Sequence, residues 1–129
     1  MLDTNVVSAL MRAPWGALRQ RIEMVGEGAV CVSIVTTAEL HFGAALTPSS
    51  KGLANFKLIL RGLRVMPIEP PTDAHYGRIR ADLHKRGRLI GPNDLWIAAH
   101  ALALDLTLVT ANTGEFSRVE GLRMENWLA

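Results

Sequence analysis

Short apolar segments alternate along the chain with longer amphipathic segments. The short segments are rich in β-branched residues, as buried strands are. We expect strands at Met1–Leu2, Val30–Val35, Arg64–Ile68, Thr107–Thr110 and Leu122–Glu125. We expect helices after Asp3-Thr4-Asn5 to about Met11, and at about Pro14–Val25, Thr36–Leu46, Lys51–Arg61, Thr72–Arg86 and Asn93–Leu104. Strands that alternate with helices or helix pairs predict an α/β fold with a mostly parallel sheet and helices on both faces.

Turn-forming residues separate these segments. The expected breaks are Glu27–Gly28, Pro48–Ser50, Pro70–Pro71, Gly87–Pro92 and a polar turn at Ala111–Gly114. The chain has 129 residues, without an internal repeat or a low-complexity linker, so a single domain is expected.

Composition excludes several classes of protein. Hydrophobic residues make up 49% of the chain, which is enough for a folded core. No apolar run approaches the roughly 20 residues of a membrane span, and no export signal is recognisable. Cys31 is the only cysteine, so an intramolecular disulfide and a cysteine-based zinc site are impossible. We expect a soluble, cytoplasmic protein in which Cys31 is a small buried hydrophobe.

Acidic side chains follow several of the expected strands. Asp3 comes directly after the first strand, Glu39 lies in the first turn after the second, and Asp94 opens a later helix. Asn112 follows the fourth strand, and Glu115 comes one turn later. Because ligands of open α/β sheets bind at the carboxyl ends of the strands, these oxygen-bearing side chains are expected to share one crevice.

Each of the three acids also has a purely structural explanation. Asp3 could cap the following helix. Glu39 ends the sequence Thr36-Thr37-Ala38-Glu39, which has the pattern of a capping box. Asp94 could complement a helix dipole. What favours a shared site is that all three would point into the same crevice.

Clustered carboxylates repel one another, and a divalent cation removes that repulsion. Oxygen ligands without cysteine favour a hard ion, Mg²⁺ or Mn²⁺, that keeps several waters. Such an ion can acidify water and stabilise the transition state of phosphodiester hydrolysis. The expected chemistry is therefore metal-assisted hydrolysis without a side-chain nucleophile.

Four segments together resemble the motifs of PIN domains, and in particular the VapC toxins of type II toxin–antitoxin pairs, including their FitB-like members. The segments are Leu2-Asp3-Thr4-Asn5, Ser33 with Thr37-Ala38-Glu39-Leu40, Gly91-Pro92-Asn93-Asp94-Leu95-Trp96-Ile97-Ala98-Ala99, and Thr110-Ala111-Asn112 with Glu115-Phe116. The tail Gly121–Trp127 also fits, so the resemblance covers the whole chain, residues 1–129, as one PIN domain.

The resemblance implies a three-layer α/β/α sandwich and a Mg²⁺- or Mn²⁺-dependent endoribonuclease that acts on structured RNA such as transfer or ribosomal RNA. It also implies a homodimer and a cognate VapB-like antitoxin whose C-terminal segment occupies the groove of the active site. Asp3, Glu39 and Asp94 match the first three acidic positions, with Asp3 and Asp94 as the metal ligands.

The fourth acidic position is ambiguous. Many PIN domains carry Asp where this chain has Asn112, and Glu115 is close enough to take its place as a catalytic acid. The polar residues that match those lining the site of PIN domains are Thr4, Asn5, Ser33, Thr110 and Asn112 itself.

Three alternative functions have different sequence requirements. A histidine-based ribonuclease would need two converging histidines, and nothing pairs His41, His75, His84 or His100. A receiver-type signalling domain would need adjacent acids after the first strand, where Asp3 stands alone. A PIN-like module that binds RNA without cleaving it stays open because of Asn112.

Charge and aromatic residues add less. The net charge is +2, but if three acids hold a metal, nine remain against fourteen Lys and Arg. The run from His84 to Arg88 could then bind RNA, or could be a solvated helix end. The three tryptophans could stack bases, but none is assigned to RNA, and Trp96, two residues after Asp94, is expected on the opposite side of the helix, in the core.

Overall fold

The computed structural model describes residues 1–46 and 50–128. The helices are α1 (Thr4–Arg12), α2 (Ala17–Val25), α3 (Ile34–Leu46), α4 (Ser50–Gly62), α5 (Thr72–Lys85), α6 (Pro92–Ala103) and α7 (Thr113–Phe116), with a short 3₁₀ helix η1 (Glu27–Ala29). The strands are β1 (Cys31–Ser33), β2 (Arg64–Met66), β3 (Leu108–Val109) and β4 (Met124–Glu125). The break expected at Pro48–Ser49 lies outside the described residues, and Ser50 is already part of α4.

Leu2 occupies the centre of a parallel sheet. β1 pairs with β2 and β3 pairs with β4, and Leu2 bridges Val32 on one side and Val109 on the other. The order across the sheet is therefore β2–β1–Leu2–β3–β4, and every pairing is parallel. The expected mostly parallel sheet is confirmed, although its strands are shorter than the apolar segments suggested.

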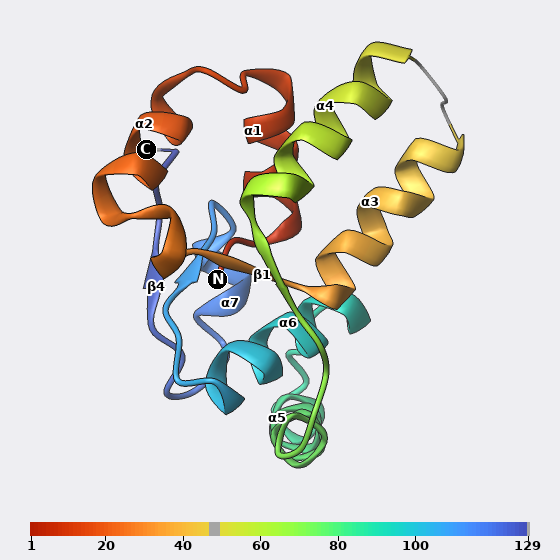
Figure 1. Cartoon of the computed structure of the whole chain (residues 1–129). Helices are drawn as coiled ribbons and strands as arrows, with labels where there is room; N and C mark the ends of the chain where they lie inside the picture. Colours follow the sequence, from red (N-terminus) through yellow and green to blue (C-terminus); the bar gives the residue numbers. More distant parts are fainter. Residues whose placement is uncertain (47–49, 129) are drawn as a thin grey trace.

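Alternate residues of the strands point into two separate cores. Met1, Cys31 and Leu108 pack against apolar side chains of α5, α6 and α7. Their immediate neighbours Leu2, Val32 and Val109 pack against α1, α2 and α4 on the opposite face. Figure 1 shows α1, α2 and α4 above the sheet and α5 and α6 below it. The three-layer α/β/α arrangement is confirmed, and Cys31 is buried and free as expected.

Two local features differ from the sequence prediction. α3 begins at Ile34 rather than Thr36, because the Ser33 hydroxyl accepts a hydrogen bond from the Val35 amide and so caps the helix there. The expected polar turn at Ala111–Gly114 leads instead into the short helix α7, which carries Glu115.

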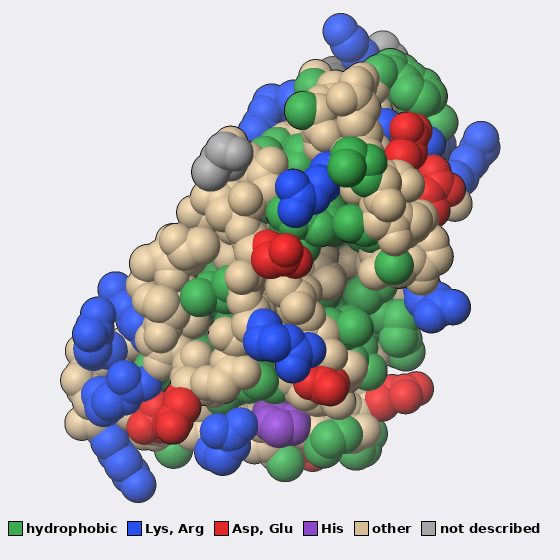
Figure 2. All heavy atoms as spheres, turned by 90° about the vertical axis from the view of Figure 1, so that its left-hand side faces the viewer, with side chains coloured by type: hydrophobic (Ala, Val, Ile, Leu, Met, Phe, Trp, Pro, Cys, Tyr) green, Lys and Arg blue, Asp and Glu red, His purple; other side chains and the backbone are tan. Residues whose placement is uncertain are grey.

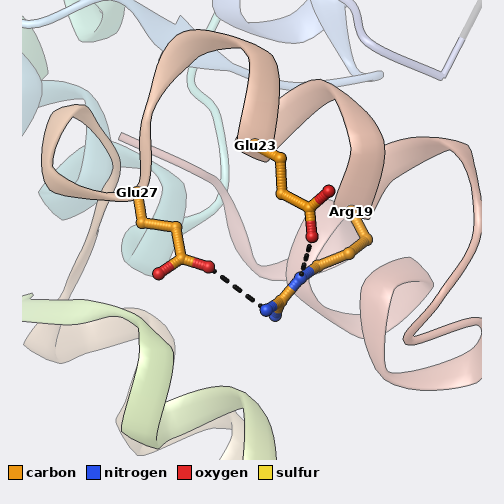
Figure 3. A network of polar contacts seen from close by, with 3 residues as sticks. All are labelled: Arg19, Glu23 and Glu27. Carbon is orange, nitrogen blue, oxygen red and sulfur yellow. Dashed lines mark hydrogen bonds and ion pairs between the residues drawn. The ribbon is translucent and has the colours of Figure 1, made fainter.

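The outer helix α2 is held by exposed ion pairs. Arg19 lies within 3.2 Å of Glu23 and 3.1 Å of Glu27, so a single guanidinium joins α2 to η1 (Figure 3). Exposed pairs of this kind contribute only a few tenths of a kcal/mol each. In the described ranges no helix is long and apolar enough to span a membrane.

Candidate active site

Asp3 stands where the central strand meets α1. Its amide donates to the Val109 carbonyl (3.0 Å), which fixes the residue against β3. Its carboxylate accepts from the Val6 amide (2.9 Å) and from the Thr110 hydroxyl, and it is 3% exposed. Burial raises the pKa of Asp3, the hydrogen bonds oppose that rise, and the nearby Glu39 adds to it. Asp3 therefore caps a helix, as predicted, and also faces a second carboxylate.

Glu39 does not form the capping box that its sequence context suggested. Because α3 begins at Ile34, Thr36 is buried inside the helix and cannot be its N-cap. Glu39 Oε1 instead accepts a 2.5 Å hydrogen bond from the Thr4 hydroxyl, next to Asp3. The structural explanation for Glu39 is wrong, and the side chain is turned towards the end of the central strand.

Asp94 lies in the first turn of α6, directly after Pro92 and Asn93. Its pKa is raised to about 7, first by burial, then by the charge of Glu115 and a hydrogen bond to it, and then by Glu39 and Asp3. A helix N-terminus favours a negative charge, so the crowding outweighs the helix dipole here. Four carboxyl groups thus act on one another at this end of the sheet.

Asn112 and Glu115, the two candidates for the fourth acidic position, are bonded to each other. The Asn112 amide donates to Glu115 Oε2, and the Gly91 amide donates to Glu115 Oε1 (3.0 Å). The Asn112 backbone amide donates in turn to the Thr110 hydroxyl (2.9 Å). Glu115 supplies the fourth carboxylate beside Asp94, and Asn112 orients it.

The remaining polar candidates lie at different depths. The Thr4 hydroxyl donates to Glu39, and the Thr110 hydroxyl donates to Asp3. Asn5 has an exposed side chain, and its backbone amide bonds to the Asp3 carboxylate. Ser33 has no exposed surface, so it supports the site from beneath rather than lining its open surface.

Ser33 joins the site to a buried histidine. His100 Nδ1 lies 2.8 Å from Ser33 Oγ, and His100 Nε2 lies 3.0 Å from the Pro67 carbonyl. A carbonyl only accepts, so Nε2 carries the proton and Nδ1 accepts from the Ser33 hydroxyl. The imidazole thus ties α6 to the ends of β1 and β2.

The other histidines have unrelated neighbours. His41 packs edge-on against Phe56, and His75 contacts Arg78. His84 lies exposed on α5. Among the described residues no two histidines contact each other as a pair for acid–base catalysis.

The donor set of the site suits a hard divalent cation. Asp3, Glu39, Asp94 and Glu115 offer only oxygen ligands, and their mutual repulsion leaves negative charge for a cation to neutralise. Within residues 1–46 and 50–128, no three acidic, histidine or cysteine side chains already surround one point as metal ligands. The carboxylate oxygens of Asp3, Glu39 and Glu115 instead accept hydrogen bonds, in that order, from the Val6 amide, the Thr4 hydroxyl and the Asn112 amide.

A groove of about 990 Å³ opens beside the carboxylates, between α1, α3, α4 and the start of α6. Thr4, Ser8, Glu39 and Asn93 are the polar side chains that line it, and most of the other lining residues, such as Phe42, are apolar. Trp96 also lines this groove, so the expectation that it is an ordinary core residue is wrong. Its spacing of three residues from Asn93 puts both on one helix face, and this was the signal in the sequence.

Comparisons with known proteins agree with this geometry. The model of the PIN domain family matches residues 1–122. Ribonuclease VapC2 of Haemophilus influenzae is 42% identical over 99% of this chain and 97% of that protein. The tRNA(fMet)-specific endonuclease VapC of Shigella flexneri is 38% identical over 98% of this chain and 96% of that protein.

A solved structure extends the agreement to the fold. VapBC2 from Rickettsia felis, bound to a DNA fragment from its promoter, superimposes with a TM-score of 0.93 at 30% identity, covering 98% of this chain and 97% of that chain. A signalling receiver is thereby excluded. The chain belongs to the PIN domain family and, within it, to the VapC ribonucleases.

Proposed function

We propose that the chain is the toxin of a toxin–antitoxin pair and cleaves RNA as an endoribonuclease that requires Mg²⁺ or Mn²⁺. The observation that carries this proposal is the gathering of four carboxyl groups at one partly buried place, where burial and then the charges of Glu115, Glu39 and Asp3 raise the pKa of Asp94 to about 7. Carboxyl groups crowded in this way are a feature of functional sites more often than of structural ones.

Asp3 and Asp94 are the proposed ligands of the cation. Asp3 is fixed by β3 and the start of α1, and Asp94 by the first turn of α6, so both are held on rigid elements. A bound divalent cation supplies positive charge and Lewis acidity to a phosphodiester and to water. Glu115, held by Asn112 and Gly91, adds the charge that the amide at position 112 lacks.

Glu39 is the proposed base. The Thr4 hydroxyl holds one of its oxygens, and the other orients the attacking water and takes a proton from it. The water oxygen bonds to phosphorus, the bond from phosphorus to the leaving oxygen breaks, and that oxygen takes up a proton. The products are a phosphomonoester and a hydroxyl end.

Transfer or ribosomal RNA is the proposed substrate class, since a relative from Shigella flexneri is named for its specificity for tRNA(fMet). Lys and Arg side chains are spread over the face shown in Figure 2, with a few acids among them. We place a VapB-like antitoxin in the groove beside the carboxylates, because the apolar lining of the groove suits a protein segment. A homodimer and a cytoplasmic location complete the proposal.

The test is cleavage of purified tRNA with Mg²⁺, with Mn²⁺ and with EDTA, for the unaltered chain and for Glu39→Gln. We expect cleavage only with metal, and a loss on the order of 100-fold for Glu39→Gln. Glu120→Gln, at an exposed acid near β4, is the matched control and should cleave normally. Cleavage that survives EDTA, or full activity of Glu39→Gln, would contradict the mechanism, and binding without cleavage would favour an RNA-binding module.

A further inference from the structure

Trp96 and Tyr76 form a stacked aromatic pair at the edge of the groove. Their ring centroids are 3.9 Å apart and their planes differ by 17°, so the rings are nearly parallel. Trp96 comes from α6 and Tyr76 from α5, and both are only partly buried. The stack fixes the plane of the indole without covering it completely.

Trp96 lines the groove together with polar residues of the site. It lies one helical turn after Asn93 on α6 and shares the groove with Glu39. An aromatic surface of fixed orientation therefore lies in the same groove as Glu39, the proposed base that acts on a phosphodiester. A flat, apolar and sequence-tolerant surface of this kind matches the face of a nucleobase.

Positive charge lies on the other side of the stack. Arg80 donates to the Tyr76 hydroxyl (3.0 Å), and its guanidinium lies 5.9 Å from the centre of that ring. Within the described part of the chain Arg80 is in no ion pair with a carboxylate, so it keeps its charge for a phosphate.

We propose that Trp96 is a stacking site for a nucleobase of the RNA next to the bond that is cleaved, and that Arg80 binds a backbone phosphate of the same strand. This proposal rests on the proposed ribonuclease function and adds the subsite that positions the strand. RNA is favoured over a protein segment beside Trp96 because the groove also holds Glu39, and because Arg80, next to the stacked Tyr76, has no carboxylate partner among the described residues.

The first test uses Trp96 as its own reporter. A chain with Trp15→Phe and Trp127→Phe keeps Trp96 as its only tryptophan, and both removed rings lie outside the groove. Purified tRNA is added in EDTA, where no cleavage is expected. We expect the Trp96 emission to be quenched as tRNA binds. Emission that does not respond to bound tRNA would overturn the proposal, and a change that follows protein concentration without RNA would assign the ring to a contact between two copies of the chain.

The second test compares variants by tRNA affinity and by cleavage. Trp96→Leu should weaken binding roughly 5- to 150-fold, the range expected for one stacked base, and Trp96→Phe should weaken it less. Arg80→Gln should weaken binding and reduce its salt dependence. Trp15→Leu and Arg61→Gln, at exposed positions elsewhere, are the controls and should bind normally.

Circular dichroism shows whether each variant is folded. Folded Trp96→Leu and Arg80→Gln that bind tRNA like the unaltered chain would overturn the proposal. If the unaltered chain cleaves no RNA at all, the ribonuclease function itself fails. Normal metal-dependent cleavage, together with tRNA affinity that does not change in the Trp96 variants, refutes only the stacking site.

Discussion

The two ends of α6 hold partly or fully buried titratable groups in opposite situations. At the C-terminal end His100 is 1% exposed, and each ring nitrogen has a hydrogen-bond partner, Ser33 or Pro67. Burial lowers the pKa of His100, and the hydrogen bond to the Pro67 carbonyl only partly opposes this, so the fold favours the neutral form of the ring. At the N-terminal end the pKa of Asp94 is raised to about 7 by burial and by neighbours of like charge.

The difference separates a structural role from a functional one. Neutral partners satisfy His100, so its polar atoms stabilise the junction of three elements. Like charges surround Asp94, so the folded state is less stable for their presence unless a cation joins them. A carboxylate such as Asp94, whose charge has no opposite charge beside it in the fold, is expected to act in metal binding or catalysis, whereas His100 is expected to stabilise the fold.

The largest expected effect comes from Asp94→Asn. Cleavage should fall by more than roughly 100-fold, because a proposed metal ligand loses its charge. In EDTA the variant should be as stable as the unaltered chain or more stable, since one of four repelling charges is gone. Cleavage rates and thermal unfolding check both parts. A marked drop in the melting temperature in EDTA would favour a structural role for Asp94.

The opposite result is expected for His100. His100→Leu should lower the free energy of unfolding by about 1–3 kcal/mol, because Ser33 and the Pro67 carbonyl lose their partner. His100→Asn can still accept from Ser33, and His100→Gln can still donate to Pro67, so each should lose less. Denaturant unfolding measures the loss. Folded variants with normal stability and no cleavage would instead revive a histidine-based mechanism.

The smallest effect is expected at the fourth acid. Glu115→Gln should lower activity about 10-fold and shift the Mg²⁺ titration to higher concentration, because it removes a charge that acts through its neighbours. Asn112→Asp should be tolerated or should tighten metal binding, since it adds a carboxylate beside Glu115. Titrating Mg²⁺ against cleavage rate tests both. An identical curve for Glu115→Gln would mean that the site works with three carboxylates.

The sequence was sufficient for the sheet and for the residues that gather at its edge. Alternation of strands and helices predicts the parallel pairing, and the rule that strand ends meet at one edge predicts that Asp3, Glu39 and Asp94 lie together. The sequence does not decide between Asn112 and Glu115, because their hydrogen bond depends on the helical turn of α7. At this place the sequence predicts a polar turn and not a helix.

The other differences between the predicted and the observed structure arise from local hydrogen bonds and from helix packing. Ile34 and Val35 are β-branched and extend the apolar run of β1, so they suggested a longer strand. The Ser33 cap starts the helix two residues earlier and thereby removes the capping-box explanation of Glu39. Trp96 was assigned to the core from its angle to Asp94 alone. Its stacking on Tyr76 depends on how α5 packs against α6, which periodicity does not reveal.

The claim that these carboxylates are a cation site also predicts how stability depends on pH. Asp94 has a pKa of about 7 in the folded chain and about 3.9 when unfolded. Between these values the unfolded chain has released the proton while the folded chain still binds it, so the folded state loses stability as pH rises. Asp94→Asn lacks this loss of stability, and it has every other titratable group of the unaltered chain.

The most direct measurement is therefore thermal unfolding of the unaltered chain and of Asp94→Asn from pH 4.5 to 8, in EDTA and with Mg²⁺. In EDTA the melting temperature of the unaltered chain should decline relative to that of Asp94→Asn up to about pH 7. At pH 8, Mg²⁺ should raise the melting temperature of the unaltered chain and leave Asp94→Asn nearly unchanged. Parallel pH curves, together with an equal response of both chains to Mg²⁺, would contradict a cation site built on Asp94.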